Sequence, residues 1–141
     1  MYQKIVIVGN LGRDPEMRYA PSGQAVTNFS LATNRQYTSS SGERVKETVW
    51  FRVSAWGRQA ETCAEYLRKG SRVLVEGRLT ADPATGGPRI WRRQDGSAAA
   101  SFEISAGSVT FLSSRADEED DDHPDGEPAP AGRFDEEDIP F

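Results

Sequence analysis

Five stretches of the chain alternate apolar and polar residues, or form short apolar runs, as β-strands do. β-branched and aromatic residues gather in all five, which cover about Lys4 to Val8, Ala25 to Asn34, Glu47 to Trp56, Arg72 to Leu79 and Ser101 to Leu112. Beyond residue 112 the apolar periodicity stops. The pattern therefore predicts five strands within residues 1–112.

Turn sequences separate these strands. Residues 20–23 place Pro second and Gly fourth, which suits a type I turn. Asp95-Gly96 is a hairpin signal, because both residues tolerate the conformations that tight hairpin turns need. The segments 39–43 and 83–88 are rich in Ser, Gly and Pro, and we expect them to form the tips of extended β-hairpins.

One helix is predicted between the third and fourth strands. Ala60, Cys63, Ala64 and Leu67 follow the i, i+3, i+4, i+7 spacing of an apolar helix face, and Gly70 can end the helix. Five strands with a helix between the third and fourth is the order of an OB-fold, a barrel often used to bind oligonucleotides or oligosaccharides. We expect a mainly β protein with this five-stranded OB-fold barrel, although the fold alone does not select the ligand.

The charge of the chain is divided between two regions. Residues 1–115 contain 16 Lys and Arg and 10 Asp and Glu, a net charge of +6, whereas residues 116–141 contain one Arg and 12 acids, a net charge of −11. The acidic region is poor in apolar residues and cannot offset the entropy of ordering. We therefore expect an OB-fold domain at 1–112, a disordered acidic linker at 113–132 and an acidic C-terminal tip at 133–141.

The chain has few residues that could act in catalysis or bind a metal ion. Cys63 is the only cysteine and lies on the apolar face of the helix, and the only histidine, His123, lies in the acidic region. We therefore expect no catalytic residue, no metal site and no cofactor. The apolar run Ile5 to Val8 is too short for a signal peptide or a membrane span, so we expect a soluble, cytoplasmic protein.

The third predicted strand carries the first candidate binding residues. Side chains alternate across a strand, so Trp50, Arg52, Ser54 and Trp56 share one face, while the core face is supplied by Val49, Phe51, Val53 and Ala55. Aromatic rings beside a cation match the stacking and phosphate contacts that single-stranded nucleic acid needs. The alternative is that both tryptophans pack under a loop or in a subunit interface.

A second strip repeats this composition. In Arg89-Ile90-Trp91-Arg92-Arg93, charged residues again interleave with an aromatic, which favours nucleic-acid binding over a solvated hairpin held by its own cation–π contacts. Tyr37 beside Arg35 in the first long hairpin is a third candidate. Its alternative is an ordinary hairpin-packing role. The candidate DNA-binding residues are therefore Arg35, Tyr37, Trp50, Arg52, Trp56, Arg89, Trp91, Arg92 and Arg93.

The C-terminal tip has a separate chemistry. Ile139 and Phe141 can enter an apolar pocket on a partner while the terminal carboxylate and neighbouring acids meet a basic rim, and Pro140 limits the entropy lost on docking. The alternative is a solubilising tail with incidental apolar residues. The candidate docking residues are Asp135, Glu136, Glu137, Asp138, Ile139, Pro140 and Phe141.

Three motifs together resemble the bacterial single-stranded DNA-binding protein family. They are Val8-Gly9-Asn10-Leu11-Gly12-Arg13-Asp14-Pro15 followed by Arg18-Tyr19 and Gly23, then Glu65 to Ser71 with Val75 to Leu79, and finally Asp138-Ile139-Pro140-Phe141. The resemblance covers about residues 1–112 and the last few residues. It places Trp50, Trp56 and Trp91 at the family's stacking positions, with Tyr37 at a hairpin position that often holds another.

This resemblance implies an OB-fold that binds single-stranded DNA with little sequence preference, usually as a homotetramer, in replication, recombination and repair. It also implies that the tip recruits replication, recombination and repair proteins, in the cytoplasm at the nucleoid. Exposed Val6 and Val8 on strand one favour assembly, because strand one is apolar on both faces. Two rival functions are a protein adaptor docked by the tip, and an OB-type nuclease, which lacks the acid clusters it would need.

Overall fold

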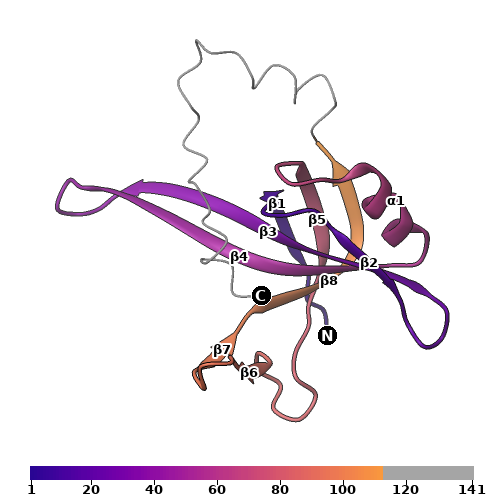
Figure 1. Ribbon diagram of the computed structural model, residues 1–141. Coiled ribbons are helices and arrows are strands. Elements are labelled where there is room, and N and C mark those ends of the chain that lie inside the picture. Colours follow the sequence, from indigo (N-terminus) through magenta and orange to yellow (C-terminus); the bar gives the residue numbers. More distant parts are fainter. Residues whose placement is uncertain (113–141) are drawn as a thin grey trace.

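The computed structural model describes residues 1–112, which form a barrel with two projecting hairpins (Figure 1). The predicted linker at 113–132 and tip at 133–141 lie outside the described residues. The elements in chain order are β1 (Ile5–Leu11), β2 (Glu16–Tyr19), β3 (Ala25–Thr38), β4 (Arg44–Trp56), α1 (Arg58–Tyr66), β5 (Arg72–Leu79), β6 (Ile90–Arg92), β7 (Ala98–Ala100) and β8 (Phe102–Phe111).

Five strands close into a barrel. The sheet order is β1-β5-β8-β4-β3, and β3 returns to β1 through the pairs Asn10↔Ala32 and Leu11↔Leu31. β4 and β8 run parallel to each other, and the other pairs in the ring are antiparallel. In chain order, helix α1 connects the third and fourth barrel strands, β4 and β5. The predicted OB-fold is therefore confirmed.

The core forms where the inward faces of the strands meet. Leu31, Val53, Val73, Val75 and Ile104 are all almost completely buried. Burial alternates along the barrel end of β4, as predicted, because successive side chains of a strand point to opposite faces. Apolar burial of this kind is the main force that holds the barrel together.

Helix α1 covers one end of the barrel. Its Ala60 and Cys63 are fully buried, as is Leu67 just after the helix. The buried Thr27 hydroxyl donates a hydrogen bond of 2.6 Å to the carbonyl oxygen of Ala60, which fixes the helix to β3. The helix ends at Tyr66, because Leu67 already has an extended backbone, so the predicted stop at Gly70 lies too far along the chain. Gly70, at φ +90°, lies instead in the turn that leads into β5, in a conformation that glycine adopts without strain.

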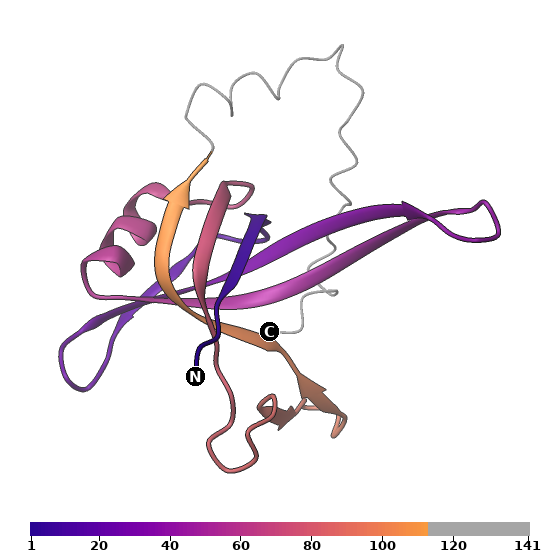
Figure 2. The same ribbon diagram turned by 180° about the vertical axis from the view of Figure 1, so that it is seen from behind.

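Two hairpins project from the barrel and are seen from both sides in Figures 1 and 2. β3 and β4 continue past the barrel as a long two-stranded arm that pairs as far as Thr38↔Arg44. β6 and β7 form a small hairpin that turns at the predicted Asp95-Gly96, where Gly96 N–H donates to the Arg93 carbonyl at 3.0 Å. β2, which the hydrophobic pattern did not predict, pairs with β3 across the predicted turn at 20–23.

The described residues offer no membrane or metal feature. No helix within 1–112 has the length and apolar character that crossing a bilayer requires. The same residues contain no group of three or more His, Cys, Asp or Glu side chains placed to hold a metal ion.

Candidate nucleic-acid interface

The outward face of β4 carries the first predicted residues as a continuous row. Register pairs each of them with a residue on β3: Trp50 with Ala32, Arg52 with Ser30, and Trp56 with Val26. Paired residues of an antiparallel sheet point to the same face. The barrel therefore presents Trp50, Arg52 and Trp56 on one surface, as the alternation predicted.

Trp50 is packed closely against Gly12, at the end of β1. A Cβ atom built on Gly12 would lie only 2.5 Å from Cζ3 of Trp50 and 2.7 Å from its Cη2, so only glycine leaves room for the indole ring. Trp50 keeps an intermediate exposure. The glycine of the N-terminal motif thus sets the position of a predicted stacking residue. The packing and stacking interpretations of Trp50 are both compatible with this arrangement.

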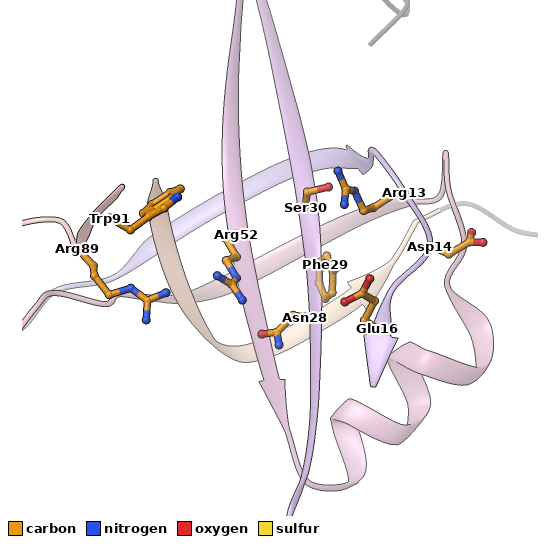
Figure 3. Close-up of a pocket in the computed structure, with 9 residues that line it drawn as sticks. All are labelled: Arg13, Asp14, Glu16, Asn28, Phe29, Ser30, Arg52, Arg89 and Trp91. Atoms are coloured by element: carbon orange, nitrogen blue, oxygen red, sulfur yellow. The ribbon is translucent and has the colours of Figure 1, made fainter. Parts of the chain in front are cut away.

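Beside this row lies a groove of about 500 Å³ (Figure 3). Figure 3 shows Arg89 and Trp91 entering it from one side and Arg13, Asp14 and Glu16 from the other, with Arg52 between them. The remaining lining residues are Asn28, Phe29 and Ser30. The fold therefore joins Arg52 of β4 to Arg89 and Trp91, which are far away in the sequence. The two predicted strips meet here through Arg52 on one side and Arg89 and Trp91 on the other, while Trp50 and Trp56 do not line this groove.

Glu103 of β8 links two of the three arginines that line the groove, Arg52 and Arg89. Its Oε1 lies 2.8 Å from Nη2 of Arg89 and 3.8 Å from Nη1 of Arg52. The Glu103 side chain is only 16% exposed, whereas that of Arg89 is 55% exposed. The carboxylate thus lies beneath the two guanidinium groups. The sequence analysis did not identify this residue.

Trp56 lies in a second groove of about 390 Å³, on the far side of Ser54 from Arg52. Arg78 and Leu79 of β5 and Ser105 of β8 also line it. Trp56 is 44% exposed, which leaves part of its ring surface open to a ligand. The outward face of the barrel therefore offers aromatic surface and a cation at two neighbouring grooves.

Arg92 and Arg93 lie at the turn of the β6–β7 hairpin and do not line either groove. Nη1 of Arg92 donates to the Gly96 carbonyl at 3.2 Å, and Nη1 of Arg93 lies 3.5 Å from the Ser97 hydroxyl. Hydrogen bonds from Ser97 lower the pKa of Asp95, first from its side chain and then from its backbone. These contacts shape the hairpin turn, with both arginines exposed to solvent.

Arg35 and Tyr37 lie on the arm and alternate with the residues that face the same way as Trp50. The Arg35 guanidinium carbon lies 4.7 Å from the centre of the Tyr37 ring, and its Nε lies 3.6 Å from Glu47. This is the hairpin-packing arrangement that was the alternative for Tyr37. The cations that share the Trp50 face along the arm are Arg44 and Lys46, which the sequence analysis did not select.

Cys63, the only cysteine in the chain, lies on the buried face of α1 and packs into the core. Burial raises the pKa of its thiol to about 11, because a thiolate would lose its hydration there. The thiol is therefore protonated at neutral pH. A buried, protonated thiol is a poor nucleophile.

Several groove residues were missed because they lie on strands whose polar face was not examined. Asn28 and Ser30 alternate along β3 with the core residues Thr27, Phe29 and Leu31; Asn28 is half-buried, and Ser30 is itself buried. The Ser54 hydroxyl donates to Oδ1 of Asn28 at 2.7 Å, and Ser30 faces Arg52. Extending the alternation used for β4 to β3 would have identified both residues.

The fold and these grooves define a class: an OB-fold barrel whose outward face combines tryptophan rings with arginines, the combination found in oligonucleotide-binding domains. The chain belongs to the single-strand binding protein family, whose model matches residues 2–112. The family resemblance inferred from the three sequence motifs is therefore confirmed.

Similar proteins are found among both sequences and solved structures. The single-stranded DNA-binding protein of Helicobacter hepaticus is 40% identical over 115 residues, which are 82% of this chain and 64% of the relative. That of Wolinella succinogenes is 38% identical, over 82% of this chain and 67% of the relative. The chain thus spans about two thirds of their length.

A crystallised deletion mutant of the single-stranded DNA-binding protein from Thermus aquaticus has the same fold. Its TM-score is 0.61 at 30% identity, and the match covers 80% of this chain and 51% of that one.

Proposed function

We propose that this protein binds single-stranded DNA without sequence preference and protects it during replication, recombination and repair. The observation that carries the proposal is the first groove, where Arg52, Arg89 and Trp91 meet from separate elements. Family membership supports it. The proposal assigns binding and no catalysis.

In the proposed mechanism, tryptophan rings stack on bases and arginine side chains contact phosphates. Bases stack on Trp50, Trp56 and Trp91, each stacked base contributing about 1–3 kcal/mol regardless of its identity. Arg52 and Arg89 meet phosphates in the groove, while Arg92 and Arg93 extend the cationic path along the hairpin. Arg35 and Tyr37, on the face of the arm opposite Trp50, contact the strand only where it wraps around the arm. Duplex DNA is excluded because its bases are already stacked on one another.

Titration of the full chain with a single-stranded oligonucleotide tests this proposal. We expect strong quenching of tryptophan fluorescence that weakens with added salt, because phosphate contacts release counterions. The matched control is the same sequence annealed into a duplex, which should cause almost no quenching. Equal binding of the duplex, or no binding of either DNA, would contradict the proposal, and metal-dependent cleavage would favour a nuclease.

We further propose that the protein assembles as a homotetramer. Val6 and Val8 on the outer face of β1 are 52% and 48% exposed in a single chain, while Ile5 and Ile7 pack against the core. An exposed apolar strand face is typical of a surface that another subunit covers. Mass in solution, measured with and without a long oligonucleotide, gives the number of subunits. A monomer at micromolar concentration would contradict this proposal.

The C-terminal tip is proposed to recruit replication, recombination and repair proteins in the cytoplasm, at the nucleoid. Ile139, Pro140 and Phe141 would enter an apolar pocket while Asp135 to Asp138 meet a basic rim. Deleting residues 139–141 should abolish recruitment of such a partner and leave DNA affinity unchanged. If recruitment survives the deletion, the tip is a solubilising segment only.

A further inference from the structure

Glu103 is an acid placed among groups that are proposed to bind phosphate. One oxygen of its carboxylate contacts two of the groove arginines, at 2.8 Å from Arg89 and 3.8 Å from Arg52. At 16% exposure, its side chain is the most buried partner of these ion pairs. Its charge therefore acts on both guanidinium groups at short range and with limited screening by solvent.

The backbone holds this carboxylate in place. Glu103 lies beside Arg52 in the parallel pairing of β4 and β8, so both side chains leave the sheet on the same face. The Glu103 carbonyl also accepts a hydrogen bond of 2.8 Å from Thr80 N–H, at the end of β5. Strands on both sides thus fix the acid beneath the groove.

Its effect on the groove follows from the charges. Arg52 and Arg89 alone would present two positive charges to a phosphate, and Glu103 cancels one of them. Asp14 and Glu16 also line the groove, on the same side as the cation Arg13. The region around the groove is therefore close to neutral before DNA arrives, although the domain as a whole is basic.

From this arrangement we infer that Glu103 is the resident counterion of the DNA groove: it holds Arg52 and Arg89 when no DNA is bound and competes with phosphate for them. This inference rests on the proposed function. The competition lowers affinity at this groove and lets a bound strand leave more readily. A protein that must be removed from DNA when the strand is copied or paired benefits from such a groove.

The test removes the charge and keeps the shape, in the full chain. Glu103→Gln should bind a single-stranded oligonucleotide about threefold to tenfold more tightly at low salt, because one more positive charge faces the phosphates. The slope of log affinity against log salt concentration should steepen by up to about 0.7, the value for one phosphate contact on a single strand. A purely structural role for Glu103 would not steepen this slope.

Two control variants separate charge from other effects. Glu65→Gln makes the same change of net charge on the exposed surface of α1, at the other end of the molecule from the β6–β7 hairpin in Figures 1 and 2, and should leave the slope unchanged. Glu103→Asp keeps the charge and should keep the wild-type slope. In an Arg89→Gln background the gain from Glu103→Gln should shrink, because the two residues act on each other.

The outcomes distinguish this inference from the proposed function. If the wild-type chain binds no single-stranded DNA, the proposed function fails. If wild type binds, and a folded Glu103→Gln variant with unchanged circular dichroism binds equally or more weakly, only the counterion role is overturned. A Glu103→Gln variant that does not fold, together with a Glu103→Asp variant that has an altered salt slope, would also overturn the role.

Discussion

The outward face of β4 and the β6–β7 hairpin carry the same combination of tryptophan and arginine on very different supports. β4 is a barrel strand: Trp50, Arg52 and Trp56 are all paired with β3, and the segment around Arg52 is also paired with β8. β6 and β7 pair only with each other within the described residues. The hairpin is joined to the barrel where β7 leads into β8, and Arg89 contacts Glu103 of β8. One surface lies within the barrel sheet, and the other lies outside it.

This difference bears on how binding energy is obtained. A side chain held by a barrel loses little freedom when a base stacks on it, whereas ordering a hairpin reduces the net gain. Under the proposed function, the β4 face should supply most of the affinity. The hairpin should close the groove over a strand that is already bound.

The largest expected effect is at Trp56. Trp56→Ala should weaken binding of single-stranded DNA by about tenfold to a hundredfold, since one stacking contact contributes about 1–3 kcal/mol. Its 44% exposure predicts only a small change in thermal stability. Titration by fluorescence anisotropy measures the affinity, and Tyr66→Ala, an exposed aromatic on α1 outside both grooves, is the matched control. An affinity loss equal to that of the control would assign Trp56 to packing.

A smaller effect is expected at Gly12, which sharpens the claim that the barrel fixes Trp50. Gly12→Ala places a methyl group 2.5 Å from the Trp50 ring, so the ring must move. We expect about a fivefold loss of affinity and a loss of stability of about 1–3 kcal/mol, the usual cost of overpacking. Thermal unfolding and DNA titration measure the two quantities.

Gly107→Ala is the control for this change, because the nearest atom to its added methyl group is 3.5 Å away. It should leave DNA affinity unchanged. If Gly12→Ala lowers stability and leaves affinity unchanged as well, then Trp50 is a packing residue and the β4 face binds DNA through Trp56 and its cations.

The smallest of these effects is expected at Trp91. Trp91→Ala should weaken binding by about twofold to threefold, because part of its stacking energy is offset by ordering of the hairpin. The dissociation rate, measured by stopped-flow competition, should rise by the same factor if the hairpin closes over bound DNA. If Trp91→Ala lowers DNA affinity as much as Trp56→Ala does, the hairpin contributes as much binding energy as the β4 face, and the distinction between them is wrong.

Sequence patterns predicted the barrel well, because each strand depends on its own alternation and each turn on its own glycine or proline. The five strands, the helix and the Asp95-Gly96 turn are all local features of this kind. Alternation also placed Trp50, Arg52 and Trp56 on one face. The short strand β2 was missed because Glu16 to Tyr19 is only four residues long and exposed throughout, so its alternation of Met17 and Tyr19 with charged residues is too short to be distinctive.

The composition of the groove could not be predicted in the same way. Glu103 reaches Arg52 through the parallel pairing of β4 and β8, and Arg89 through the path of the segment between β5 and β8. Neither contact leaves a signal in local spacing, because both join residues that are far apart in the chain. The arm shows a further limit: Arg35 and Tyr37 were selected by composition as a separate candidate, and the pairing of β3 with β4 then places them on the face opposite Trp50.

The central claim is that one DNA strand occupies both surfaces, and the three tryptophans of the chain offer a direct test. Each gives one indole N–H signal in a nitrogen–proton NMR spectrum, which single Trp→Phe variants assign. On titration with a single-stranded oligonucleotide, the signals of Trp50, Trp56 and Trp91 should all shift and reach saturation at the same DNA concentration. If the Trp50 and Trp56 signals stay unchanged while DNA is bound, the barrel face is not the binding surface and the account is wrong.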